Sequence, residues 1–587
     1  MNINISNLYD AFVKFTASYI KYSKTIWISN KKLTKANCVV FDLWTKESVQ
    51  QEFSYGIPND KCFPGAIFEP GRAKELLADR YGGYGIGPNG GGARTGIIGD
   101  YQVKGIGRNP LAGHTDDEWH SYGGQSLIDA VLEAINSEVF DHILPIGTVK
   151  CHAIIFTGKD TAYMPTGDWG SETGPGALLV RDLCARPAHF LRAANFRVQE
   201  KFEKVLLNDV ERTRRVNVQL HSIFGGNKQI IQFLGSFLSN CANQFAFARL
   251  FRIYHGVLSP SNISFDGRWL DLTNISFVDG GVNYAEGREL TSFYNEIEIM
   301  LQIMEEFVYT YTKYNRTEFN IKPLVNYYRE EVDSYVAHYA ARLLGICPDW
   351  IIDHKTSKSY LHLVGKIKQM LSASPKAVVA APTGFCVDDS VVSFLEQLFS
   401  SFSEGDAARQ DELHGSFSDV FEQAFRLARS TCVYSSFVTV AAIHSLKKAY
   451  FSSFFTRGRI VAQLLALVKK VKPEFFEGYI ESHIAVAKWL FEDESSIGAI
   501  LFKSSEFELR YAGDREKYTV VINHITDEHF MSVRSLRTWV EGRATVVFFI
   551  DNYDFRPGLL RLLVVLEGLE GLKVLGDHCW EREVDYI

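Results

Sequence analysis

The residues with the clearest chemical potential lie in a glycine-rich segment and on the strand-like stretch that follows it. Residues 81–96 read YGGYGIGPNGGGARTG, and QVKGIG follows at 102–107. Glycines let bare backbone N–H groups approach a ligand closely, and nearby cations suit the oxygens of a polyphosphate. On its own the pattern is also typical of a series of turns, because it matches neither of the common glycine-rich phosphate motifs. The candidate nucleotide-binding residues here are Gly91, Gly92, Arg94 and Lys104.

A carboxylate that could orient Lys104 lies on the next predicted helix. Residues 125–144 read QSLIDAVLEAINSEVFDHIL, with apolar side chains at the spacing of an amphipathic helix. Glu133 lies off the apolar stripe. It is either a solvated side chain or the partner of Lys104, as in the lysine–glutamate pair of protein kinases.

A second group of candidates lies in a loop and hairpin predicted over 254–281. His255-Gly256-Val257 is followed by Asn262 and, nine residues later, by Asp271. An amide and a carboxylate oxygen placed at strand ends are the ligands that hold Mg²⁺ beside nucleotide phosphates. Taken separately they are ordinary turn residues. Together with the upstream glycines, lysine and glutamate they favour a nucleotide–Mg²⁺ site.

Four segments would position these residues. Residues 1–65 carry no motif and are interpreted as an N-terminal extension. Residues 66–180 predict strand, glycine loop, strand, helix and strand, and 181–490 are mostly helical. Residues 491–587 combine strand-like and helix-like patterns, which predicts a small α/β domain. The expected fold class is therefore α+β.

Composition limits the classes of function. The 587 residues carry 62 Lys+Arg against 69 Asp+Glu, a net charge of −7 that argues against broad nucleic-acid binding. Nine scattered cysteines without a C-x-x-C pair indicate reduced thiols. With neither a signal-like N-terminus nor a long apolar run, we expect a cytoplasmic protein without membrane insertion.

Residues 81–280 resemble the selenoprotein O family, kinase-fold pseudokinases that transfer AMP from ATP to protein hydroxyls. The order and spacing of seven strings carry the resemblance: YGGYGIG (81–87), GGAR (91–94), QVKGIG (102–107), EAINSEVFDHILPIGT (133–148), PGALLVR (175–181), HFLRAANF (189–196) and HGVLSPSNIS…LDLT (255–273).

The resemblance implies a bilobal, protein-kinase-like fold with a small lobe at 66–180, a large helical lobe at 181–490 and a C-terminal addition. It implies ATP and Mg²⁺ as ligands. Lys104 then resembles the phosphate-gripping lysine and Glu133 its helix partner. The family also has two arginines that hold phosphates, which Arg181 and Arg192 resemble. Its two metal ligands are matched by Asn262 and Asp271. Arg181 could equally form a salt bridge with a neighbouring strand.

The departures from the family are concentrated at the acceptor side of the site. Ser261 stands where the family carries the aspartate that acts as catalytic base. Tyr122 and Gly124 replace the aspartate and arginine of the family's G-D-G-R stretch, and Asp271 begins D-L-T instead of D-Y-G.

The missing base favours an acceptor that needs none. A hydroxyl with a pKa of about 10 or higher must lose a proton as it attacks phosphorus, whereas a carboxylate is already ionised at neutral pH. The hypothesis is therefore transfer of AMP to a peptide C-terminal carboxylate, giving an acyl-adenylate for a second, acyltransferase-like enzyme. This resembles the need met by maturation proteins of siderophore-carrying peptide microcins.

Two alternatives stay open. In the first, AMP is transferred to Ser, Thr or Tyr hydroxyls and another group, such as Asp266 or Asp271, replaces the base. In the second, the chain is a catalytically inactive nucleotide-binding scaffold for a partner enzyme.

Overall fold

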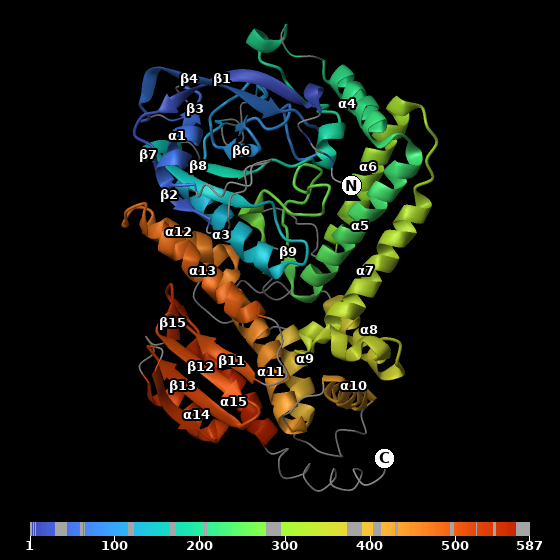
Figure 1. The fold of residues 1–587 in the computed structure, drawn as a ribbon, viewed down its shortest axis with the longest axis vertical. Helices are drawn as coiled ribbons and strands as arrows, with labels where there is room; N and C mark the ends of the chain where they lie inside the picture. Colours follow the sequence, from blue (N-terminus) through green and yellow to red (C-terminus); the bar gives the residue numbers. More distant parts are fainter. Residues whose placement is uncertain are drawn as a thin grey trace.

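Eight strands from the first 182 residues form one antiparallel sheet in the computed structural model of the protein (Figure 1). A large helical region follows, and a small sheet with helices lies at the opposite end of the molecule's long axis. The predicted α+β class is confirmed at this level. The strands are β1 (Phe12–Ile20), β2 (Lys24–Ile28), β3 (Tyr55–Gly56), β4 (Phe68–Asp79), β5 (Thr95–Ile98), β6 (Tyr101–Lys104), β7 (Cys151–Tyr163) and β8 (Thr173–Asp182).

The structure describes most of the chain. The residues outside the description are 1, 2, 4, 6, 7, 30–43, 59–62, 64, 115–121, 165–171, 205, 207, 278–294, 373–389, 403–411, 429–432, 493–497, 524, 544–547 and 571–587.

The N-terminal 65 residues take part in the sheet. Its strand order is β2-β7-β8-β6-β5-β4-β1-β3, so β1 and β3 lie at one end and β2 at the other. Strands six places apart in a flat sheet would be separated by about 29 Å. Ile20 of β1 and Lys24 of β2 are only four residues apart, so the chain between them spans at most about 14 Å. The sheet therefore cannot be flat, and it curls so that β1 and β2 approach each other. The boundary predicted at residue 65 therefore falls inside one structural unit.

The two faces of the sheet bury different elements. Helix α1 (Lys46–Phe53) packs Val49 and Phe53 into a cluster with Val103 of β6 and Val180 of β8. Helix α3 (Leu127–Ile143) contacts β7 and β8 on the other face. Side chains alternate between faces along a strand, so the neighbours of Val103 and Val180 are directed toward α3.

The helix predicted over 125–144 is confirmed as α3. Its N-terminus is capped by Ser126, whose hydroxyl accepts the N–H of Asp129 at 3.1 Å. The helix is buried on nearly all sides, including the polar side chains of Glu133, Asn136 and Glu138. The amphipathic pattern thus predicts the helix. Of the two interpretations of Glu133, the solvated one is wrong, because neighbouring elements cover its side chain.

The helical region matches the pattern predicted for residues 181–490, with a short hairpin inside it. Strands β9 (Ile253–Tyr254) and β10 (Ser276–Phe277) pair antiparallel near the ends of the loop and hairpin predicted over 254–281, of which residues 278–281 lie outside the described residues. None of the described helices is long and apolar enough to cross a membrane. The helices are α4 (Asp209–Phe224), α5 (Asn227–Leu250), α6 (Asn295–Asn315), α7 (Lys322–Leu343), α8 (Lys358–Ser372), α9 (Ser390–Ser400), α10 (Glu412–Ala428), α11 (Tyr434–Phe451), α12 (Arg457–Leu467) and α13 (Phe475–Phe491).

The tail forms the small sheet and its helices, as predicted for 491–587. In the sheet, β11 (Gly498–Lys503), β12 (Phe507–Ala512), β13 (Lys517–Ile522) and β14 (Ile525–Phe530) pair in sequence order. Helix α14 (Val533–Gly542) and a two-stranded ribbon of β15 (Phe549–Ile550) and β16 (Tyr553–Asp554) follow. Helix α15 (Arg556–Glu570) then packs against α11. Asp551 and Asn552 turn the ribbon with positive φ, as in a tight hairpin.

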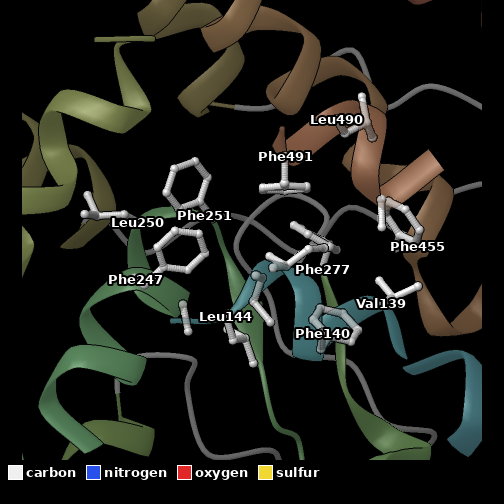
Figure 2. Close-up of a cluster of buried hydrophobic side chains, with 14 of the residues drawn as sticks. Val139, Phe140, Leu144, Phe247, Leu250, Phe251, Phe277, Phe455, Leu490 and Phe491 are labelled. Carbon is white, nitrogen blue, oxygen red and sulfur yellow. The ribbon is translucent and has the colours of Figure 1, made fainter. Parts of the chain in front are cut away.

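A buried aromatic cluster joins α3 to the helices that precede the tail (Figure 2). The ring centroid of Phe277 in β10 lies 5.7 Å from Phe140 of α3, and 6.0 Å from both Phe455 and Phe491. Phe491 ends α13, and Phe455 lies just before α12. The cluster therefore fixes the hairpin strand β10 between α3 and the C-terminal helices.

This packing predicts the cost of a truncation. Phe140→Ala removes a fully buried ring and leaves a cavity, so we expect it to lower the free energy of unfolding by about 3–5 kcal/mol. The control is Tyr309→Ala, at a position that is 67% exposed, where the change should stay within about 0.5 kcal/mol. Urea denaturation followed by circular dichroism measures both, and equal midpoints for the two variants would contradict the packing described.

Candidate functional site: a buried charge cluster between the sheet and α3

Four of the predicted site residues converge in one buried cluster. The ammonium of Lys104 donates to Glu133 Oε2 at 2.6 Å and also contacts Asp271 Oδ1. Arg181 donates from its Nη1 to Glu133 Oε1 at 2.8 Å, and the same nitrogen lies 3.9 Å from Asp271 Oδ1. Glu133 thus bridges both cations, and Asp271 closes the group from the other side.

Strand register explains why the two cations meet. Gln102 and Lys104 alternate with Val103 along β6, so they share the face that looks toward α3. Gln102 pairs directly with Arg181 of β8, and its side-chain oxygen accepts from Arg181 Nε at 2.8 Å. Two neighbouring strands therefore present Lys104 and Arg181 to the same side of the sheet.

Helix α3 supplies the carboxylate and holds the opposite wall. Glu133 is 1% exposed, and its two oxygens face the two cations. One turn later, the amide of Asn136 donates to the carbonyl oxygen of Leu272 at 2.7 Å. Because Leu272 directly follows Asp271, this bond fixes the segment that carries the second carboxylate.

Asp271 occupies a strained backbone position and is the most accessible member of the cluster. Its φ is 62° and its ψ is 56°, the left-handed region, which costs a residue other than glycine about 1–3 kcal/mol. Its side chain is 35% exposed, against 3% for Lys104. Burial raises its pKa, but the charges of Lys104, Arg181 and Arg94 outweigh burial and hold the pKa of Asp271 well below its usual range. It is a stable carboxylate at neutral pH.

The backbone of the loop that carries Asn262 and Ser261 is contacted by the ring of His255. Burial lowers the pKa of His255 to about 4, so the ring is neutral at pH 7. A neutral ring protonated on Nε2 can donate to the carbonyl oxygens of Leu270 and Asn262, at 3.1 and 3.2 Å. This places Asn262 next to the residue that precedes Asp271.

The side chains of this loop hydrogen-bond to each other. Asn262 donates from Nδ2 to the carbonyl oxygen of Val257 at 2.7 Å, and its Oδ1 accepts from the hydroxyl of Ser261 at 3.2 Å. The Ser261 hydroxyl also lies 2.9 Å from that of Ser259. At Ser261, where the resemblance predicts that the catalytic carboxylate is missing, the structure therefore places the hydroxyls of Ser261 and Ser259.

The predicted nucleotide glycines are packed against the preceding strand. A Cβ on Gly91 would lie 2.3 Å from the carbonyl oxygen of Asp79, and one on Gly92 would lie 2.3 Å from Asp79 Oδ1. The N–H of Gly92 donates to Asp79 O at 2.8 Å. Close packing is thus reason enough for glycine at both positions, and contact with a nucleotide stays a prediction.

The two remaining predicted arginines differ in their distance from the cluster. Arg94 donates to the carbonyl oxygen of Gly124 at 3.4 Å, and its charge contributes to lowering the pKa of Asp271, which places it beside the cluster. Arg192 is exposed, and its described contact is a backbone one, in which its carbonyl oxygen accepts from the N–H of Gly83. The structure does not bring Arg192 into the charge cluster.

A buried arginine that the sequence reasoning missed connects three parts of the site. Arg186 donates to Gln102 Oε1 at 3.1 Å and to the carbonyl oxygen of Ser261 at 3.2 Å. Its Nη2 lies 3.7 Å from a carboxylate oxygen of Asp79. Asp79 in turn accepts from Gln102 at 3.0 Å. Arg186 therefore connects the end of β4, β6 and the Ser261 loop.

A second missed residue, Glu296 of α6, anchors the start of the loop. Its carboxylate accepts the backbone N–H groups of His255 and Gly256 at 3.0 and 2.8 Å. Burial raises its pKa to about 7, although these two hydrogen bonds act in the opposite direction. Local sequence carried no signal for Arg186 or Glu296, because their partners lie 40 or more residues away.

The described residues contain no group of three or more His, Cys, Asp and Glu side chains that could hold a metal ion. Asn262 and Asp271 remain as the two oxygen donors predicted for a metal. The chain matches no protein-family model, and none of the curated proteins matches it significantly.

The bridging position of Glu133 predicts a large stability effect. Glu133→Gln leaves Lys104 and Arg181 buried with one carboxylate between them, so we expect a loss of about 3 kcal/mol in the free energy of unfolding. Glu75→Gln, which removes an exposed partner of Lys14, should cost at most about 1 kcal/mol. Chemical denaturation compares the two, and similar losses would contradict the role of Glu133 as a bridge.

The raised pKa of Glu296 predicts a pH dependence. Between about 4.5 and 7 the folded protein holds a proton that the unfolded chain has released, so the contribution of Glu296 to stability decreases as pH rises. From pH 5 to 7.5, wild type should lose about 2–3 kcal/mol relative to Glu296→Gln. Denaturation curves at several pH values measure this, with the exposed Glu298→Gln as control. Parallel pH profiles of wild type and Glu296→Gln would refute it.

Proposed function

We propose that the chain is an ATP- and Mg²⁺-dependent AMP transferase with a protein-kinase-like, bilobal core of the selenoprotein O type. The small lobe would be the sheet region and the large lobe the helical region. One observation carries the proposal: Lys104, Glu133, Arg181 and Asp271, predicted from four separate strings, meet in one buried cluster.

The cluster is suited to polyphosphate. Glu133 orients both cations and is itself fully enclosed. Asp271 is the partly exposed partner of Lys104, so a phosphate oxygen can take its place at the ammonium without unpairing a fully buried charge. Positively charged groups fixed in advance stabilise the charge that moves between phosphate oxygens during transfer.

The donor set fits Mg²⁺. Asp271 is ionised with a depressed pKa, and the amide oxygen of Asn262 lies in the adjoining loop. Hard oxygen ligands of this kind are those that Mg²⁺ takes beside phosphates. Asn262 and Asp271 would hold the ion, which would neutralise charge on the phosphate oxygens.

The acceptor side favours a group that is already ionised. Ser261 offers a hydroxyl, which is a poor base at neutral pH. The rival base Asp266 is hydrogen-bonded to Arg268 Nε at 2.8 Å and lines a separate cavity of about 250 Å³ with Asp100 and Phe265. Asp271 is held by Lys104 and too weakly basic to serve. A carboxylate acceptor requires none of these groups.

The proposed reaction is therefore acyl-adenylate formation. A carboxylate oxygen of a peptide C-terminus attacks the α-phosphorus of ATP, the bond from that phosphorus to the bridging oxygen breaks, and pyrophosphate leaves. No proton is transferred. The activated peptide would pass to an acyltransferase-like partner enzyme, as in the maturation of siderophore-carrying peptide microcins.

Labelled ATP tests the proposal. With α-labelled ATP, Mg²⁺ and a peptide bearing a free C-terminus, we expect pyrophosphate release and a hydroxylamine-labile label on the peptide. The same peptide with a C-terminal amide is the matched control and should give neither. A label stable to hydroxylamine would instead indicate AMP on a hydroxyl, and nucleotide binding without label would indicate a scaffold.

Substitutions test the site. Lys104→Met removes the phosphate-binding charge and should reduce AMP transfer by about 100-fold or more. Lys14→Met removes an exposed lysine of the same sheet and should leave transfer unchanged. Full transfer in Lys104→Met and in Asp271→Ala would overturn the site assignment.

A further inference from the structure

The segment that follows Asp271, a 3-10 turn and then β10, contacts the first residue of α12. Arg457 donates from Nε to the carbonyl oxygen of Thr273 at 2.8 Å, and its backbone N–H donates to the Ser276 hydroxyl at 2.9 Å. Both acceptors lie within five residues of Asp271. The contacts join parts of the chain more than 180 residues apart.

Apolar packing reinforces the same connection. Figure 2 shows Phe277, which ends β10, among Phe140, Phe455 and Phe491. Phe455 lies two residues before Arg457, so the approach to α12 contacts this segment through both a ring and a guanidinium. The segment from 272 to 277 is therefore fixed on one side by α3 and on the other by the start of α12.

Helix α12 is also fastened to the tail. Gln463 donates to the carbonyl oxygen of Asp551, in the turn of the β15–β16 ribbon, and Arg459 Nη1 donates to the same oxygen at 3.5 Å. The Arg459 guanidinium stacks 4.0 Å from the ring centroid of Phe454 and 5.3 Å from that of Tyr553. One helix thus contacts the tail ribbon near its middle and the Asp271 segment at its N-terminus.

We infer that Arg457 is a positioning residue for Asp271, and that the tail acts on the site through α12. The inference rests on the proposed function for its consequence, namely that nucleotide and Mg²⁺ bind tightly only when Asp271 is in place. A left-handed residue other than glycine persists only where its surroundings over-determine it. Asn136 supplies that constraint from α3, and Arg457 supplies it from the C-terminal half.

The charge of Arg457 gives it a second influence on the site. Burial raises the pKa of Asp129, in the first turn of α3, although the hydrogen bond from Ser126 and the charges of Arg94, Lys104 and Arg457 act in the opposite direction. Arg457 and Lys104 therefore share Asp129 as an electrostatic neighbour, and Arg457 also contacts the backbone that follows Asp271.

Hydrogen exchange tests the inference without any requirement for activity. Arg457→Gln removes the guanidinium, so the amides of residues 272–277 should exchange at least about tenfold faster than in wild type, while those of α5 stay unchanged. Arg457→Lys keeps a donor for Thr273 and should restore most of the protection. Arg515→Ala, at an exposed position in the tail, is the control. Unchanged exchange at 272–277 in Arg457→Gln would overturn the inference.

The tail connection has its own test. Gln463→Met removes the hydrogen bond to Asp551 while keeping the size of the side chain, and exchange at 272–277 should rise about threefold. An unchanged rate in this variant would overturn the role assigned to the tail.

Binding of a fluorescent ATP analogue with Mg²⁺ separates this inference from the proposed function. Arg457→Gln should raise the dissociation constant about tenfold in the wild-type background and leave it unchanged in Asp271→Asn, because the two residues act together. An equal effect in both backgrounds would contradict the positioning role. Failure of wild type to bind the nucleotide at all would contradict the proposed function, while the exchange result would still decide whether Arg457 holds the segment.

Discussion

The buried interaction of Glu133 with Lys104 and Arg181 is the constraint on which the arrangement of the site depends. A carboxylate and two cations removed from water are each costly, and the cost is offset only if all three keep their partners. That requirement links the register of β6 and β8 to the rotation of α3 about its axis. A slip of one residue in either strand would direct the cation to the opposite face, into the cluster around Val103 and Val180.

Partial exposure distinguishes Asp271 from the other members of the cluster. Glu133 and the two cations form an enclosed unit that needs no ligand, whereas Asp271 adds a negative charge at the rim from a strained backbone. The enclosed unit can stay fixed while its outer partner is exchanged. Under the proposed function, this arrangement would keep the cations oriented before nucleotide binds, which would reduce the reorganisation that binding requires.

Local patterns in the sequence predict the helices and strands well, but they do not predict which distant residues pack around those elements. The helix at 125–144, the hairpin at 254–281 and the helical and mixed character of the later segments follow from spacing alone. Lys104, Glu133, Arg181 and Asp271 were predicted from motif order, and the structure brings them together. By contrast, the strands in residues 1–65 pair with partners distant in sequence, so nothing local marked them as part of the sheet. The same reason applies to Arg186 and Glu296. Arg192 is exposed and lies outside the cluster, although the family resemblance matches it to a phosphate-holding arginine.

The curled sheet has a consequence for how the chain acquires its structure. Phe12 of β1 pairs with Asp79, and Lys24 of β2 pairs with Phe156. The consecutive strands β1 and β2 therefore pair with segments that are synthesised at very different times. Closing loops of this length costs conformational entropy before any strand hydrogen bond forms, so such pairings form slowly. Neither end of the sheet can be completed by local contacts. The charge cluster also joins distant parts of the chain, because Lys104 and Asp271 are 167 residues apart. We therefore expect the cluster to form after the local elements.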